Sequence, residues 1–275
     1  MARKEPFLAF GYDTEYYGRK AKSEKEAKAN RDHEVASVRK LVALHTDQGV
    51  PATFFMLGKL VELEQRFKSI FRSRSDLIDV QQHTYSHSLV MEKNGFDRPR
   101  ITPAQLKSEI RKTKSLIKDS YGVDCTGVRL PYTFKGGLKG HAALQKAVKE
   151  AGMMFVSSDN SSDDQKSPSF ISNPVQPYRY KNGLIELPLN GFMDTSLLQA
   201  PWKSRKSLDL PSIFLEEFRF AVENRLVYAP GFHPWALAMV DPKLDIIKNL
   251  IKEARRLGVE MMSYRMLCSK VGEDA

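Results

Sequence analysis

Short apolar runs alternate along the chain with longer segments in which apolar residues recur every three or four positions. The short runs have the length of buried strands, and the longer segments have the period of helices that pack on one side. Repeated strand and helix indicate a parallel sheet covered by helices, and about seven such units fit an α/β barrel better than a short open sheet. We expect strands at residues 7–12, 51–57, 76–82, 125–129, 153–158, 184–189, 226–232 and 259–264.

Capping residues mark the helix boundaries. One helical pattern follows residue 31 and stops at Gly49. Thr102 opens another helix, because Pro103 suits a first helical position and Gln105 stands where a capping box needs it. Gly122 ends that helix. Further helices are expected at residues 141–152, 210–224 and 242–258.

The composition favours a folded, soluble protein. Of 275 residues, 41% are hydrophobic, and a chain of this size buries about three-quarters of its unfolded surface. No run approaches the roughly 18 apolar residues of a membrane span, and the first residues lack the features of a signal peptide. Without a repeat or a clear linker, we expect a single cytoplasmic domain over residues 1–275. The sequence does not indicate an oligomeric state.

The net charge of +10 is compatible with two kinds of partner. Clustered basic residues are typical of nucleic-acid binding. However, the richest basic stretch, residues 19–31, contains Glu24 and Glu26 and carries no aromatic-laced motif. We therefore expect no nucleic-acid partner, whereas an anionic glycan or a phosphate-linked sugar stays open as a ligand.

Polar and ionisable residues follow the ends of five of the expected strands. In a barrel of parallel strands, side chains at the carboxyl ends converge on one mouth, so these residues are expected to form one site. A purely structural barrel has little reason to place them there. The residues are Asp13, Glu15, His83, His87, Arg129, Tyr132, Asp159 and His233.

His83 and His87 form the sharpest local feature. Four positions apart, they fall on one face of a helical turn, where both imidazoles can bind one divalent ion. A carboxylate would complete a site that leaves positions for water and substrate. The spacing alone is moderately specific, because the chain's histidines give on the order of 0.1 chance pairs. A coincidence on a helix surface is the alternative, and the acidic pair Asp13 and Glu15 argues against it.

Six motifs, taken in order, resemble those of the polysaccharide deacetylase family, the NodB-homology domain of carbohydrate esterase family 4. The resemblance extends over nearly the whole chain and implies the family's fold, a single-domain distorted (β/α)7 barrel. The motifs are FGYDTE at residues 10–15, PATFFMLG at 51–58, QQHTYSHS at 81–88, VRLPY at 128–132, VSSD at 156–159 and PGFHPW at 230–235.

This resemblance implies a metal-dependent hydrolase that removes an N-acetyl group from an amino sugar or glycan. Glu15, His83 and His87 would bind the metal, and Asp13 would act as general base on metal-activated water. The metal implied is zinc, with cobalt, manganese or nickel as alternatives. The common family motif has two adjacent aspartates, whereas Thr14 separates Asp13 from Glu15 here, so which carboxylate binds the metal stays open.

The resemblance also implies roles for four further residues. The backbone N–H of Tyr132 would stabilise the oxyanion. Arg129 would pair with the general base and keep it ionised. His233 would protonate the leaving amine, and Asp159 would hold His233 in the required tautomer.

Two alternatives to N-deacetylation stay open, because the D-x-E and FHPW sequences resemble a divergent branch of the family. One is hydrolysis of another C–N bond, in an N-formyl sugar or a cyclic ureide, since divergent relatives of this barrel accept such substrates. The other is a non-catalytic protein that binds glycan or nucleic acid on the same barrel. Retention of Asp13 and His233 argues against the second alternative, because a binding module needs neither a base nor an acid.

Overall fold

The computed structural model describes residues 5–15, 21–71, 76–92, 99–160, 169–199 and 209–273. Within them, an eight-stranded sheet has the order β10-β2-β3-β4-β5-β6-β8-β7 and is parallel except between β7 and β8. A smaller parallel sheet has the order β11-β1-β9. The strands are β1 (Phe7–Ala9), β2 (Gly11–Thr14), β3 (Ala52–Met56), β4 (Ile78–Gln82), β5 (Gly127–Phe134), β6 (Phe155–Asp159), β7 (Tyr178–Arg179), β8 (Ile185–Glu186), β9 (Val227–Tyr228), β10 (Gly231–Phe232) and β11 (Glu260–Met262).

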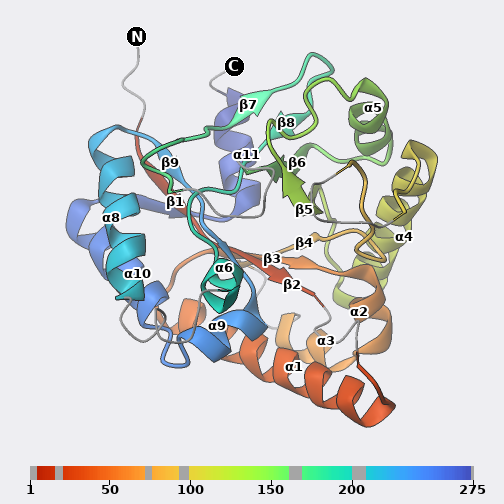
Figure 1. Cartoon of the computed structure of the whole chain (residues 1–275), viewed down its shortest axis with the longest axis horizontal. Helices are drawn as coiled ribbons and strands as arrows, with labels where there is room; N and C mark the ends of the chain where they lie inside the picture. The colour runs from red at the N-terminus through yellow and green to blue at the C-terminus, as the bar shows by residue number, and fades with distance from the viewer. Residues whose placement is uncertain are drawn as a thin grey trace.

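The first predicted strand is divided in the middle. Its first half, β1, pairs with β9 and β11, whereas its second half, β2, pairs with β10 and β3. The predicted strand at residues 226–232 divides in the same way into β9 and β10. The two sheets therefore share these segments, and the strands curl into a half-barrel (Figure 1). The predicted α/β fold with a parallel sheet is confirmed, and the distorted barrel that the resemblance implies is present as a half-barrel.

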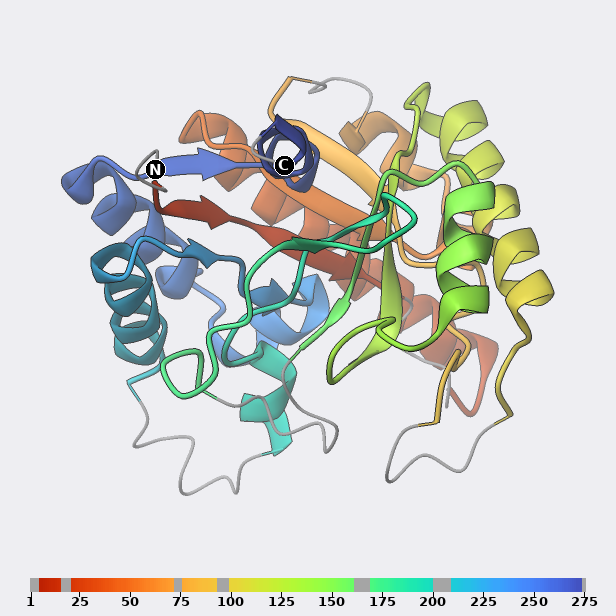
Figure 2. The ribbon, with the colours of Figure 1, turned by 90° about the horizontal axis from the view of Figure 1, so that it is seen from above.

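Helices flank the strands on both sides (Figure 2). The predicted helices correspond to α1, α4, α5, α8 and α10, while α2, α3, α6, α9 and α11 were not predicted. No helix in the described part of the chain is long and apolar enough to cross a membrane. The helices are α1 (Glu24–Asp47), α2 (Gly58–Leu63), α3 (Arg66–Phe71), α4 (Pro103–Tyr121), α5 (Ala142–Glu150), α6 (Asp194–Gln199), α8 (Leu210–Glu223), α9 (Pro234–Val240), α10 (Asp245–Leu257) and α11 (Tyr264–Glu273).

The inner face of the curled sheet changes from apolar to polar along the first strand. Alternate side chains of a strand share a face, so Phe7, Ala9 and Asp13 all point inward. Phe7 and Ala9 lie in a buried apolar cluster with residues of β3, β6 and β8, and α11 packs on this cluster through Tyr264 and Leu267. We call this cluster the apolar floor. It lies below the carboxyl ends of the strands, where Asp13 is placed.

The predicted capping box of α4 is present. The Thr102 side chain accepts a hydrogen bond from the backbone N–H of Gln105 at 3.2 Å, and the Gln105 side chain accepts one from the N–H of Thr102 at 2.8 Å. Gly122 ends the helix with a left-handed backbone (φ 76°). Both signals read from the sequence are therefore confirmed.

Replacing Thr102 with alanine is expected to lower the free energy of unfolding by about 1 kcal/mol, because one N–H at the start of α4 loses its acceptor. Urea denaturation measures the change. Ser108→Ala, at an exposed position of the same helix, is the matched control and is expected to leave stability nearly unchanged. Equal destabilisation by the two variants would contradict the role of the cap.

Candidate metal centre

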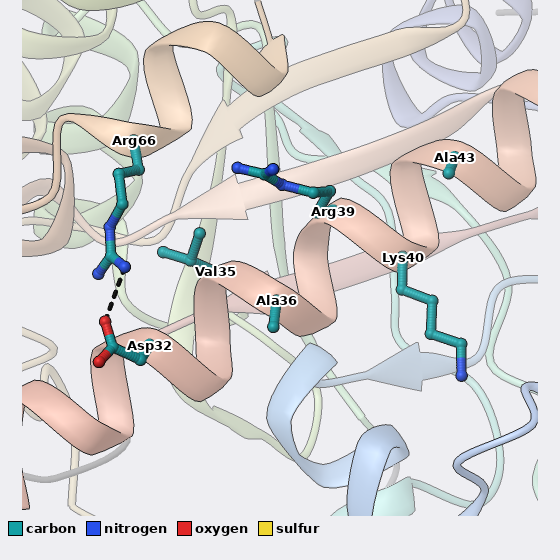
Figure 3. Close-up of a pocket in the computed structure, with 7 residues that line it drawn as sticks. All are labelled: Asp32, Val35, Ala36, Arg39, Lys40, Ala43 and Arg66. Carbon is teal, nitrogen blue, oxygen red and sulfur yellow. Dashed lines mark hydrogen bonds and ion pairs between the residues drawn. The ribbon is translucent and has the colours of Figure 1, made fainter.

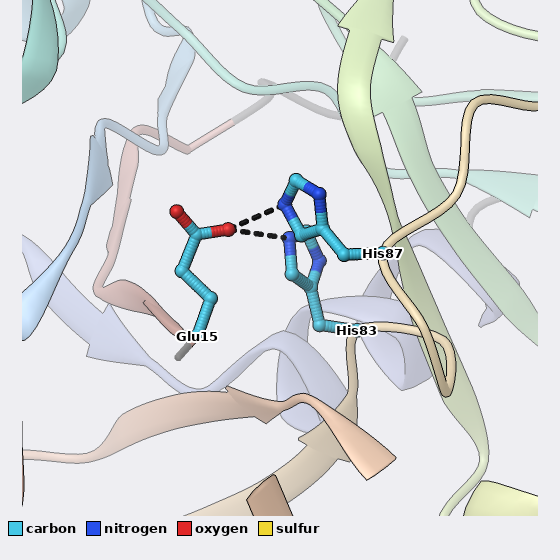
Figure 4. Close-up of side chains that lie close together, drawn as sticks. All are labelled: Glu15, His83 and His87. Atoms are coloured by element: carbon cyan, nitrogen blue, oxygen red, sulfur yellow. Dashed lines mark ion pairs between the residues drawn. The ribbon is translucent and has the colours of Figure 1, made fainter. Parts of the chain in front are cut away.

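Glu15, His83 and His87 place their side chains around a common point (Figure 4). Glu15 follows β2, whereas both histidines follow β4. The Nε2 atom of His87 forms a short ion pair with Oε2 of Glu15, and Nε2 of His83 lies 3.6 Å from the same oxygen. The potential ligand atoms of the three residues all lie within 4.8 Å of one another. This spacing fits coordination of a single ion.

The backbone that presents the two histidines is an irregular loop. Thr84 and His87 have positive φ angles of 57° and 58°, so the predicted helical turn is wrong, although both rings still reach the same site. A left-handed backbone is costly for these residues and has to be held by its surroundings. Glu109 of α4 supplies this support, because its carboxylate accepts hydrogen bonds from the backbone N–H groups of Tyr85 and Ser86 at 3.2 and 3.1 Å.

The hydrogen bonding of His83 leaves one ring nitrogen available for a cation. Its Nδ1 atom lies 3.0 Å from the carbonyl oxygen of Arg129. A carbonyl oxygen only accepts, so Nδ1 carries a hydrogen, and Nε2 is the ring nitrogen that faces Glu15. Burial opposes ionisation of Glu15, but His87 and His83 hold the pKa of its carboxyl well below the usual range. Two imidazoles and one carboxylate form a donor set suited to a catalytic zinc ion.

Asp13 lies beside this centre and is held by Arg129. Oδ1 of Asp13 accepts a hydrogen bond from Nη1 of Arg129 at 2.7 Å. The arginine side chain is fully buried, and its guanidinium lies 4.0 Å from the ring centre of Phe55 and 4.8 Å from that of Tyr264. Its Nε donates to Ser157 at 3.1 Å. This packing fixes the Asp13 carboxylate on top of the apolar floor.

His233 faces Asp13 from the start of α9. Its Nε2 atom lies 3.9 Å from Oδ2 of Asp13, and its Nδ1 atom lies 2.8 Å from Oδ1 of Asp194. Asp194 also accepts a hydrogen bond from the backbone N–H of His233. Burial opposes a charge on the ring, but the Asp194 carboxylate, together with the charges of Glu15 and Asp13, raises the pKa of His233 to about 10. This arrangement suits a proton donor.

The predicted pairing of His233 with Asp159 is wrong. Asp159 ends β6 and accepts hydrogen bonds from the backbone N–H of Gly136 at 2.9 Å and from the Tyr178 hydroxyl at 3.1 Å. Asp194, the partner that the structure gives to His233, was missed. The only signal for it in the sequence is an aspartate shortly after the expected strand at residues 184–189. No spacing rule connects that aspartate to a histidine so much later in the chain.

Tyr132 lies in a distorted part of β5 next to the centre. The register between β5 and β6 shifts between Arg129 and Phe134, and Tyr132 and Thr133 both have positive φ angles, of 70° and 39°. The ring of Tyr132 meets that of His87 edge to face, with 4.8 Å between centroids. Backbone strain of this kind is common at functional sites.

Glu34 is a second residue that the sequence analysis missed. It lies on α1, is fully buried, and neither carboxylate oxygen has a hydrogen-bond partner of standard geometry. Burial raises the pKa of its carboxyl well above the usual range, and the charge of Glu15 adds to this effect. The only signal in the sequence is an acidic residue next to Val35, on the apolar side of a helix.

Comparisons with known proteins relate the chain to one family. Residues 29–156 match the model of the polysaccharide deacetylase family. This range includes His83, His87, Arg129 and Tyr132, whereas the motifs with Glu15 and His233 lie outside it. No curated protein sequence matches the chain.

Solved structures extend the similarity to almost the whole chain. A structure described as a polysaccharide deacetylase of Mycobacterium smegmatis is 16% identical, with a TM-score of 0.63 over 99% of this chain and 92% of that one. The Puue allantoinase is 13% identical, with a TM-score of 0.71 over 98% of this chain and 90% of that one. A carbohydrate esterase family 4 pseudoenzyme of Bacillus anthracis is 12% identical, with a TM-score of 0.56 over 97% of this chain and 66% of that one. At these identities the similarity shows the fold.

Proposed function

We propose that the protein is a metal-dependent hydrolase that removes an N-acetyl group from an amino sugar or glycan. The family match and the fold, which both relate this chain to the polysaccharide deacetylases, support the proposal. The observation that carries the proposal is that a set of three metal ligands and a base–acid pair lie side by side at the mouth of the barrel. Glu15, His83 and His87 gather their ligand atoms within 4.8 Å. Beside them, Asp13 and His233 face each other at 3.9 Å.

The residues of the mouth divide the chemistry of amide hydrolysis between them. Glu15, His83 and His87 would hold the ion, with zinc as the first choice and cobalt, manganese or nickel as alternatives. A divalent ion in this position lowers the pKa of water towards neutrality and polarises a carbonyl group. Asp13 removes the proton from the attacking water, and the hydrogen bond from Arg129 orients its carboxylate.

The remaining steps concern the leaving group. Attack places negative charge on the amide oxygen, and the backbone N–H of Tyr132 stabilises it, a contribution of roughly 3 kcal/mol in related chemistry. His233 donates the proton of Nε2 to the departing nitrogen, while Asp194 holds Nδ1 and so fixes the tautomer. Acetate and a free amino sugar are the products.

Acetate release from N-acetylglucosamine oligomers, measured after metal removal and after addition of zinc, cobalt, manganese or nickel, tests the proposal. We expect metal-stimulated release. Absence of stimulated release across a broad panel of N-acylated sugars would reject N-deacetylation.

Hydrolysis of a cyclic ureide is the second candidate, because the fold is also similar to that of the Puue allantoinase. The same panel should therefore contain allantoin and an N-formyl sugar. The intact ligand set of Glu15, His83 and His87 supports the metal-dependent deacetylase over this candidate. Turnover of allantoin without any acetate release would make ureide hydrolysis the first candidate and N-deacetylation the second.

A further inference from the structure

A groove of about 660 Å³ lies between α5 and β7, outside the candidate metal centre. We call it the basic groove. Figure 1 shows the two elements at the upper edge of the molecule, at the end of the sheet that β7 and β8 form. Its lining includes a single acidic residue, Glu150, and five cationic ones: Lys139, Lys146, Lys149, Arg179 and Lys181.

Most of this positive charge has no carboxylate partner. Glu150 is neutralised by Lys107 of α4 at 2.7 Å, and Lys146 approaches it at 3.7 Å. Within the described part of the chain, Lys149 and Lys181 form no ion pair, and both are exposed. A hollow with several unpaired cations attracts negatively charged ligands.

A rigid turn forms one wall of the basic groove. The Tyr178 hydroxyl lies within hydrogen-bonding distance of two acceptors, Asp159 at 3.1 Å and the carbonyl oxygen of Gly136 at 3.0 Å. Tyr180 accepts a hydrogen bond from the backbone N–H of Leu138 at 2.8 Å and donates to the buried Glu186 at 2.7 Å. These bonds hold the turn that carries Lys139, so part of the groove is ordered before any ligand arrives.

The basic groove continues towards the mouth of the barrel. Lys139 also lines a second hollow of about 330 Å³, together with Lys135, Arg100 and Phe134. Phe134 ends β5, the strand that carries Tyr132 at the candidate metal centre. Glu92 also lines this second hollow and lies 3.7 Å from Arg100, so Lys135 and Lys139 carry its excess of positive charge.

We propose that the basic groove binds the acidic groups of a polysaccharide. The partner class is a glycan chain with carboxylate or sulfate groups, and its assignment as substrate rests on the proposed function. Single-stranded nucleic acid is disfavoured because such binding uses exposed aromatic rings for base stacking. In this groove Tyr180 is buried, and the ammonium of Lys139 covers the ring of Tyr178 at 3.9 Å.

Binding to hyaluronan oligosaccharides tests the proposal, because these chains carry both N-acetyl groups and carboxylates. The full chain is used after metal removal, so that binding is measured without turnover. We expect binding that weakens as salt rises, and a loss of about tenfold or more in the Lys149→Glu, Lys181→Glu double variant, which corresponds to about 1.4 kcal/mol. Affinity for an uncharged N-acetylglucosamine hexamer should stay unchanged.

A matched control reverses the same amount of charge elsewhere. Arg39 lines a separate hollow on α1 and takes no part in the Asp32–Arg66 ion pair drawn there (Figure 3). Lys252 is exposed on α10. The Arg39→Glu, Lys252→Glu double variant should keep hyaluronan affinity within about twofold, allowing for the long-range effect of net charge.

The outcomes separate this proposal from the proposed function. Equal losses of hyaluronan affinity in the two double variants, or no hyaluronan binding at low salt, would overturn the proposal that the basic groove binds an acidic glycan. Tighter binding of a single-stranded oligodeoxynucleotide that depends on Lys149 and Lys181 would also overturn it and assign the groove to nucleic acid. If hyaluronan binds as expected while no N-acylated sugar is hydrolysed, the groove stands and the proposed activity fails.

Discussion

Replacing Glu15 with alanine is expected to weaken binding of a divalent ion by more than 100-fold, beyond the 10–100-fold typical of losing a residue that only supports a ligand. The physical reason is the loss of the single carboxylate in a set of three ligands. Acetate release should fall with the metal. Competition with a chromophoric chelator measures the affinity for zinc independently of activity.

Asp13→Asn is the matched comparison, because it removes a negative charge two positions away while keeping the size of the side chain. This variant should retain zinc and lose turnover by about 10²–10⁴, as expected when a general base is removed. The amide can still accept the hydrogen bond from Arg129. If Asp13→Asn lost zinc and Glu15→Ala retained it, Asp13 would be assigned as the metal ligand and Glu15 as the general base.

Replacing His233 with alanine is expected to lower turnover by about 10² or more while zinc binding persists, because the leaving nitrogen loses its proton donor. Asp194→Asn should lower turnover by a similar or larger factor, since the amide cannot stabilise the charged ring. An unchanged rate in His233→Ala would reject the role of His233 as the proton donor.

The pH profile distinguishes an effect on His233 from a general loss of structure. Burial opposes a charge on His233, but Asp194, with smaller contributions from Glu15 and Asp13, raises its pKa to about 10. Without this carboxylate the pKa falls, so the ring loses its proton at a lower pH. The alkaline limb of the rate profile in Asp194→Asn should therefore move to lower pH, a shift that simple unfolding does not produce.

Asp159→Asn provides the control for Asp194→Asn, because both variants neutralise a buried aspartate. Asp159 contacts Gly136 and Tyr178 and lies outside the His233 pair, so turnover on a short neutral substrate should change by less than about tenfold. A loss as large as that of Asp194→Asn would restore Asp159 to the role predicted from the sequence motif.

The order of strands and long helices was predictable because it depends on local periodicity. The capping box at Thr102 and the glycine stop at Gly122 are local signals as well, and both are present. The short helices α6 and α9 escaped prediction because too few residues repeat for a period to be recognised. Their stability comes from contacts with the rest of the fold, including contacts between α6 and α9.

Most residues of the candidate site were predictable from the sequence, but the contacts that hold them in place were not. The histidine spacing suggested one helical turn, whereas Glu109 stabilises an irregular loop that delivers both rings. Likewise, motif order pointed to Asp159 as the partner of His233. The actual pairing depends on how α6 lies beside α9, and sequence separation carries no information about that contact.

The position of α11 has a consequence for biosynthesis. The apolar floor joins Phe7, near the start of the chain, to Leu267, and Tyr264 stacks beside the arginine that orients Asp13. A nascent chain therefore cannot assemble this layer until residues 264–273 have left the ribosome. Until then, the arginine that orients the general base lacks the packing of Tyr264, so we expect hydrolytic competence to arise only after α11 has been translated.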